Sequence, residues 1–187
     1  MVERSVFEQV VDGVSKIAKS LKLGSGFDPE SQMGPLISRE HRNHVHSLVE
    51  SGVRDGAEVL SGGKLCGGEG YFYKPTVLAS VRSEMAVVQE EIFGPVVTAM
   101  PFDDPDEVVS LANDTPYGLA GSIWTRDVSK AHHMVASIRA GLLWINCHGI
   151  PDMAVPFGGY KQSGWERENG WEGLEKYTEL KSVLTLL

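Results

Sequence analysis

Cysteine is scarce in this sequence of 187 residues, which contains only Cys66 and Cys147. Two cysteines are too few for the disulfide framework of a small secreted domain. No C-x-x-C or H-E-x-x-H spacing is present, so the usual sequence patterns of a zinc site are missing as well. We therefore predict neither a disulfide-stabilised fold nor a metal site.

Clusters of basic residues and long apolar runs are also missing. Lys and Arg number 17 against 25 Asp and Glu, and the net charge of -8 argues against a nucleic-acid or anionic-membrane partner. No apolar stretch approaches the roughly 20 residues that span a bilayer, and the N-terminus carries Glu3 and Arg4 instead of a signal-like apolar block. We expect a cytoplasmic protein with no nucleic-acid and no membrane partner.

The hydrophobic content of 42% is typical of a globular protein, and the length suffices for one large domain with a sizeable core. Apolar periodicity and turn residues predict helices and strands that alternate along most of the chain. The expected helices cover residues 6–21, 38–53, 104–111 and 129–139, and the expected strands cover 57–63, 71–81, 96–101, 118–125 and 141–147. This alternation predicts an α/β fold with a mainly parallel open sheet and helices on both faces.

The C-terminal section differs in kind from the rest. A short helix is expected near Trp171 to Lys176, and residues 180–187 form an apolar, strand-like tail. An apolar strand with an open edge must be covered, and pairing with the sheet of another subunit would cover it. We therefore divide the chain into a main domain, 1–175, and an oligomerisation strand, 176–187, and predict a homo-oligomer.

The stretch "QEEIFGPVV", residues 89–97, raises a functional question because two adjacent carboxylates run straight into an aromatic residue, a glycine and a proline. Neighbouring residues of an extended chain face opposite ways, so one carboxylate can face solvent while the other faces whatever the turn approaches. This pattern is typical of a ligand contact.

Four segments in one order, "QEEIFGPVV", "NDTPYGLAGSIWTRD", "GLLWINC" and "PFGGYKQSG", resemble the C-terminal portion of the NAD(P)-dependent aldehyde dehydrogenase superfamily. The resemblance extends from Val2 to Leu187. It implies the catalytic-domain fold of that family and a role in oxidising an aldehyde to a carboxylic acid through a cysteine thioester, with NAD or NADP as the cofactor.

The resemblance also implies the roles of several residues. Glu91 is expected to accept hydrogen bonds from the ribose hydroxyls beside the nicotinamide, and Phe93 is expected to pack beside the nicotinamide ring. Glu90 is expected to be a solvent-facing or structural residue. His41 and His44 fall near the polar positions of a helix that approaches the same ribose. The alternatives are that Glu91 caps or pairs with a nearby base and that the histidines are ordinary surface residues.

The segment after "WIN" corresponds to the mouth of the family's substrate tunnel. Cys147, Gly149, Pro151 and Phe157 are therefore candidate walls for the aldehyde. These residues are apolar or small, so a hydrophobic or aromatic aldehyde, such as an arylacetaldehyde, would suit them better than a charged one.

The nucleophilic cysteine of the family is expected upstream of Met1, together with the general-base glutamate and the glycine-rich cofactor unit, and no G-x-G-x-x-G occurs in the chain. Cys147 is a poor substitute because it matches the tunnel wall, its neighbours are apolar, and His148 should face the opposite side of the strand. No catalytic residue is assigned. The chain alone is expected to be inactive and to bind the dinucleotide weakly.

Two alternatives stay open. One is a non-catalytic α/β module that self-associates or binds a partner through its apolar tail, and the other is a half that complements a separate N-terminal chain. One departure from the family pattern also stands out: Glu166 occupies a position between Trp165 and Arg167 where the family usually has glycine. If that position has a positive φ, glutamate would strain the loop; otherwise the change is a tolerated surface substitution.

Overall fold

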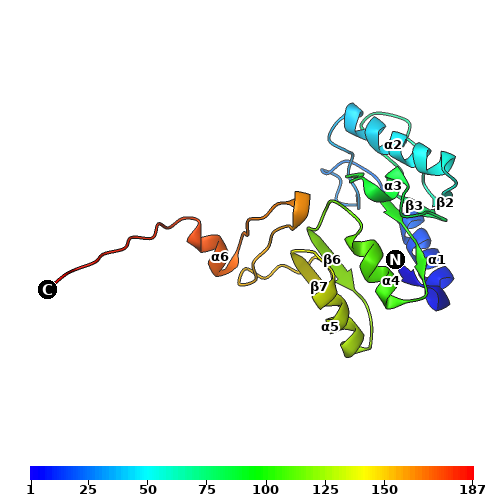
Figure 1. Cartoon of the computed structure of the whole chain (residues 1–187). Helices are drawn as coiled ribbons and strands as arrows, with labels where there is room; N and C mark the ends of the chain where they lie inside the picture. The colour runs from blue at the N-terminus through cyan, green and yellow to red at the C-terminus, as the bar shows by residue number, and fades with distance from the viewer. The chain divides into compact units, whose positions relative to one another are not determined.

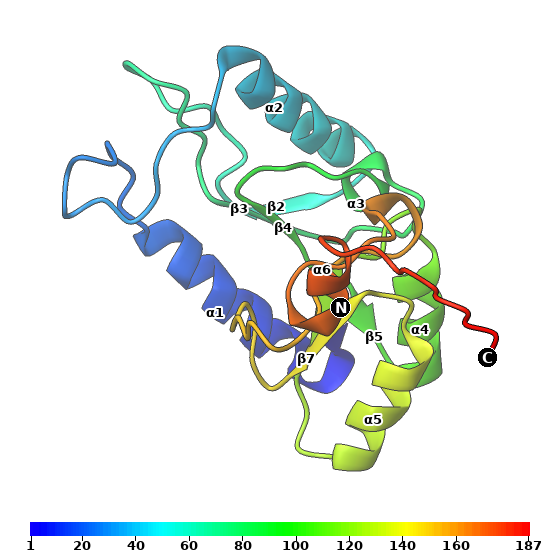
Figure 2. The same cartoon turned by 90° about the vertical axis from the view of Figure 1, so that its left-hand side faces the viewer.

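The computed structural model describes residues 1–187, which fall into two units, 1–103 and 104–187. Figures 1 and 2 show the course of the chain, and each unit is described by itself. None of the helices combines the length and the apolar character that crossing a bilayer requires.

The helices of the first unit begin and end close to the predicted positions. Ser38, the first residue of the expected helix 38–53, caps α2: its Oγ accepts a hydrogen bond of 3.1 Å from the backbone N–H of His41. A four-residue helix was not predicted, because so short a segment shows no periodicity. The helical elements are η1 (Arg4–Val6), α1 (Phe7–Ser20), α2 (Arg39–Arg54) and α3 (Ala86–Gln89).

The strands of the first unit form two small sheets. The central strand β3 pairs antiparallel with β2 and parallel with β4, while β1 pairs parallel with β5. The β2–β3 pair is antiparallel because a glycine-rich loop joins the two strands, without the helix that a parallel crossover needs. The strands are β1 (Val2–Glu3), β2 (Glu58–Ser61), β3 (Thr76–Ala79), β4 (Val96–Thr98) and β5 (Pro101–Phe102).

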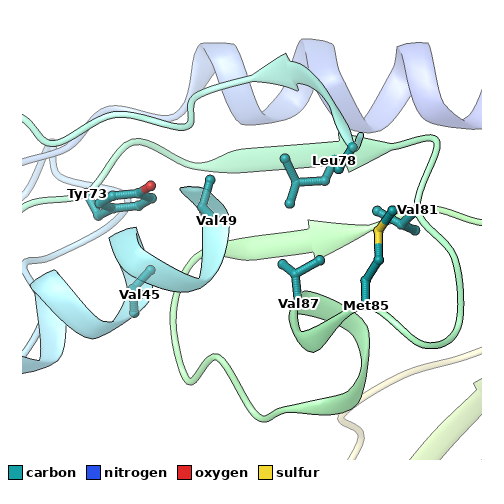
Figure 3. Packing of buried hydrophobic residues seen from close by; sticks show 8 residues of the cluster. Val45, Val49, Tyr73, Leu78, Val81, Met85 and Val87 are labelled. Carbon is teal, nitrogen blue, oxygen red and sulfur yellow. The ribbon is translucent and has the colours of Figure 1, made fainter. Parts of the chain in front are cut away.

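Strand β3 is buried on both faces, with α1 on one side and α2 on the other. Its Leu78 packs with Val45 and Val49 of α2, whereas the adjacent Val77 packs with Val11 of α1. Successive side chains of a strand point to opposite faces, so one short strand contributes to both clusters. Figure 3 shows the cluster around Leu78, to which α3 adds Val87. The prediction of helices on both faces of a sheet is confirmed here.

The second unit contains a parallel strand–helix–strand unit and a loop-rich C-terminal part. Strands β6 and β7 pair in parallel with Ser122 opposite Trp144. Asp104 and Asp127 cap α4 and α5 by accepting hydrogen bonds from backbone N–H groups of the first turn. The elements are α4 (Pro105–Asn113), β6 (Ala120–Ile123), α5 (Val128–Ser137), β7 (Leu142–Ile145), η2 (Lys161–Ser163) and α6 (Gly170–Glu175).

The α/β class and the prevalence of parallel pairs agree with the prediction, but the strands form three small sheets where one was expected. The tail contains no helix or strand in the single chain. The side chains of Leu180, Leu184 and Leu187 are 99 to 115% exposed, so nothing in this chain covers them. Pairing of the tail with another subunit, and the division at residue 175, stay predictions.

Candidate functional site

The stretch 89–97 forms a tight turn between α3 and β4. The chain leaves α3 after Gln89, becomes extended at Glu90, and enters β4 at Val96. Gly94 packs against α2 so closely that a Cβ atom there would lie 2.7 Å from Cγ2 of Val45. Glycine is therefore required where the turn meets the helix.

Phe93 lies at the apex of this turn. Its φ of +53° is uncommon for a residue other than glycine, and its side chain is 77% exposed. Strained backbone and an exposed aromatic ring together are typical of a contact with a ligand or partner. The ring of His41 lies 6.4 Å from that of Phe93, between ring centroids, at an angle of 50°. The structure therefore brings together two of the four residues predicted to contact the cofactor, Phe93 and His41.

The carboxylate of Glu91 is exposed, and no side-chain hydrogen bond or ion pair within the chain holds it. The alternative that Glu91 pairs with a nearby base is thus not seen in this chain. Glu91 and Phe93 share a hollow of about 360 Å³ that also includes Ile92 and Thr98, and the adjacent Glu90 lines it as well. An unpaired carboxylate beside an exposed aromatic ring offers an acceptor and a flat apolar face to one ligand.

A second hollow of about 510 Å³ is also lined by Phe93 and Gly94 of this turn. Its walls are largely apolar, and Tyr73 forms part of them with Phe93. The remaining lining residues are Met33, Gly34, Leu36, Gly94 and Pro95. Phe93 and Gly94 therefore line both a polar hollow and an apolar one.

Sequence reasoning missed the role of Tyr73. Its hydroxyl lies 3.2 Å from Nδ1 of His46, whose Nε2 lies 3.6 Å from a carboxylate oxygen of Glu50. Burial, reinforced by the negative charge of Glu50, raises the pKa of Tyr73 to about 12. His46 and Glu50 are visible as an i, i+4 pair, but no sequence signal connects them with a tyrosine 27 residues further along.

Three of the candidate wall residues, Cys147, Gly149 and Pro151, lie in one loop just after the carboxyl end of β7. Ligands of parallel sheets bind beyond the carboxyl ends of the strands, so this placement suits a binding wall. The fourth candidate, Phe157, lies in a separate bridge, where its backbone exchanges hydrogen bonds of 2.8 and 2.7 Å with Glu168.

The prediction that Cys147 and His148 continue the strand is wrong, because β7 ends at Ile145. Asn146 ends it with a φ of +55° and with its side-chain amide hydrogen-bonded to the backbone of Thr125 at 2.9 and 2.8 Å. His148 contacts Ser122 and makes no hydrogen bond with Cys147. The structure therefore gives Cys147 no activating base.

Glu166 does not have a positive φ, so the strain considered for this position is not present. Its carboxylate forms an ion pair of 2.8 Å with Lys176, and the hydrogen bond from Lys176 lowers the pKa of Glu166. The substitution is accommodated as a surface change.

Comparison with known proteins adds the following findings. The model of the aldehyde dehydrogenase family matches residues 1–183. The chain is 46% identical over 187 residues to a betaine aldehyde dehydrogenase of Bacillus subtilis, covering 98% of this chain and 38% of that protein. The chain thus spans well under half the length of this curated relative.

Solved structures of aldehyde dehydrogenases are also similar to this chain. An NAD+ complex of an aldehyde dehydrogenase from Bacillus cereus has a TM-score of 0.94 and 46% identity, covering 97% of this chain and 37% of that one. A betaine aldehyde dehydrogenase from Staphylococcus aureus in complex with NAD+ has a TM-score of 0.90 and 41% identity. The match covers 94% of this chain and 36% of that one.

Proposed function

Because the chain belongs to the aldehyde dehydrogenase family, we propose that it supplies the nicotinamide-end contacts and one substrate wall of an enzyme that oxidises an aldehyde to a carboxylic acid. The observation that carries this proposal is the turn between α3 and β4, which presents an unpaired Glu91 and a strained, exposed Phe93 to one hollow. The resemblance of the chain to NAD+ complexes supports NAD as the dinucleotide.

The residue types fit the cofactor. The ionised carboxylate of Glu91 can accept hydrogen bonds from two neighbouring ribose hydroxyls, and the ring of Phe93 can cover one face of the nicotinamide and exclude water. His41 lies beside Phe93, but both of its ring nitrogens are buried, so it can support the aromatic ring and does not reach the sugar in this conformation. When bound, the nicotinamide accepts the hydride that leaves the substrate carbon.

No residue of this chain is proposed as the nucleophile. Cys147 has no base beside it and belongs to the proposed wall formed with Gly149, Pro151 and Phe157. We propose that the attacking thiolate comes from the remaining part of the enzyme and that the 187-residue chain alone is inactive. An aromatic or hydrophobic aldehyde is the proposed substrate, and a cytoplasmic location stays a prediction.

A chimera tests the proposal. This chain would replace the matching 187 residues of the betaine aldehyde dehydrogenase from Bacillus subtilis. We expect the chimera to reduce NAD+ in the presence of aldehydes and the chain alone not to. Substituting Glu91→Gln should raise the KM for NAD+ about tenfold, because loss of a charge-assisted hydrogen bond costs about 1.5 kcal/mol of binding free energy.

Glu8→Gln is the matched control because it removes the same charge from an exposed residue of α1 that lies outside the hollow. A similar KM for NAD+ in both variants would show that Glu91 does not contact the ribose. Turnover by the chain alone that disappears with Cys147→Ala would instead show that the nucleophile lies within it.

A second candidate function, a non-catalytic self-associating module, is favoured by the exposed apolar tail. The two proposals are compatible, since a subunit of an oligomeric enzyme can use the tail for assembly.

A further inference from the structure

His148 lies just beyond the carboxyl end of β7, beside the candidate wall residues Cys147 and Gly149. Two neighbours hold its imidazole ring. The Oγ of Ser122, on the parallel strand β6, lies 2.6 Å from its Nδ1, and the ring meets Trp144 edge-on, with centroids 5.2 Å apart at 62°. An exposed histidine is therefore fixed in one orientation at the end of a parallel strand pair.

The loop that carries His148 is fixed as well. The indole N–H of Trp144 donates a hydrogen bond of 3.1 Å to the carbonyl of Ile150, and the amide of Asn146 is clasped to the backbone of Thr125. A side chain held by packing and hydrogen bonds loses little conformational entropy when it binds a ligand. The loop is thus prepared for recognition.

Nδ1 of His148 is occupied by Ser122, whereas Nε2 makes no hydrogen bond within the chain. In one tautomer Nε2 donates a hydrogen bond and in the other it accepts one. A hydroxyl group can pair with Nε2 in either tautomer because it both donates and accepts hydrogen bonds. A carboxylate can pair with Nε2 only when Nε2 donates. The imidazole also contacts the apolar ring system of Trp144, and the side chains of Ile150 and Met153, in the same loop, are 61 and 69% exposed.

We propose that His148, oriented by Ser122, recognises a hydroxyl group at the end of the aldehyde remote from its carbonyl, so that a hydroxyaryl aldehyde is the preferred substrate class. This inference rests on the proposed function. It adds a polar requirement to a wall that sequence reasoning treated as apolar or small. His148 is the specificity-determining residue and Ser122 is a positioning residue.

The test compares para-hydroxyphenylacetaldehyde with phenylacetaldehyde, two substrates that differ by one hydroxyl, on the chimera containing the complete chain. We expect kcat/KM to be higher for the hydroxylated substrate. His148→Phe keeps an aromatic ring and should reduce this preference about fivefold, through a higher KM for the hydroxylated substrate alone. His132→Phe, an exposed histidine on α5, is the matched control and should leave the preference unchanged.

Ser122→Ala should reduce the preference about threefold, and Ser122→Thr, which restores the hydroxyl, should recover it. A purely structural effect would change both substrates equally. An active chimera with no preference for the hydroxylated substrate, or with a preference that His148→Phe leaves unchanged, would overturn the inference while leaving the proposed function intact.

A chimera inactive on every aldehyde would count against the proposed function. The recognition step is then tested on the 187-residue chain with para-cresol and toluene as probes, followed by NMR of the His148 imidazole nitrogens. We expect para-cresol to shift the Nε2 resonance and toluene not to, with the shift lost in Ser122→Ala. Equal responses to the two probes would refute recognition of the hydroxyl.

Discussion

The roles of some single residues can be predicted from the sequence, and those of others cannot. Glu91 and Phe93 stand in a recognisable motif, and the structure exposes both in one hollow. The contact of His46 with Tyr73 and that of Ser122 with His148 join residues 27 and 26 positions apart, from different elements. Such pairs depend on tertiary packing, and no local pattern predicts them.

Tyr73 gives a test at this scale, because its pKa is raised from the ordinary value near 10 to about 12 by burial and by Glu50. A group whose pKa is higher in the folded state stabilises the fold fully below its unfolded pKa and loses that contribution as the pH rises. We therefore expect the free energy of unfolding to fall between pH 10 and about 12.

Denaturant unfolding at several alkaline pH values measures this loss, and Tyr73→Phe is the control that removes the ionisable group. The variant should be less stable at neutral pH by about 1 kcal/mol, through loss of the hydrogen bond to His46, and should show a weaker decline above pH 10. Parallel declines in both proteins would show that Tyr73 is not the group responsible.

Helices and strands are the scale at which prediction works best. The helices expected from residues 38 and 104 begin at the caps Ser38 and Asp104, and the three- and four-residue hydrophobic spacing of α1 continues to its end. Prediction fails for α3, which is too short for periodicity, and for the end of β7, which the Asn146–Thr125 hydrogen bonds determine. Apolar runs locate strands, whereas long-range contacts decide where they end.

Two glycines test the difference between intrinsic propensity and packing. A Cβ atom on Gly13, in the middle of α1, would meet no atom within 4 Å, so Gly13→Ala should stabilise the protein by about 0.5–1 kcal/mol. A Cβ atom on Gly141, at the start of β7, would lie 1.7 Å from the carbonyl oxygen of Gly158. Gly141→Ala should therefore destabilise by about 1–3 kcal/mol or more.

Thermal and denaturant unfolding of both variants measures these effects, and near-ultraviolet circular dichroism reports whether the aromatic environment of Trp144 changes with Gly141→Ala alone. Equal effects of the two alanines would mean that the close approach of residues 141 and 158 does not constrain the fold.

At the scale of the whole molecule, the alternation of helices and strands correctly predicts the α/β class, but not the number of sheets. The antiparallel β2–β3 pair arises because residues 62–75 form a glycine-rich loop that contains no helix, and a parallel crossover usually contains one. Strand pairing over long distances is set by the balance of all contacts, which a linear pattern does not contain.

The tail provides the prediction at this scale. Its leucines and Val183 are 80% or more exposed, an arrangement that invites pairing with a second subunit. Deleting residues 180–187 should shift the sedimentation profile of the chain toward the monomer while leaving its unfolding free energy in the monomeric state unchanged. An unaltered sedimentation profile would show that the tail does not form the interface between subunits.

The pairing of β1 with β5 places the first residues of unit 1 beside its last. Val2 lies opposite Pro101, and Arg4 binds both carboxylate oxygens of Asp103 through hydrogen bonds of 2.7 to 3.0 Å. A segment whose ends lie side by side can be circularly permuted. In such a variant of unit 1, a short linker would join residues 1 and 103, and the new termini would lie in the exposed glycine loop at 67–70. On the ribosome, the same geometry delays completion of this unit until Phe102 has emerged, because its opening strand has no partner before then.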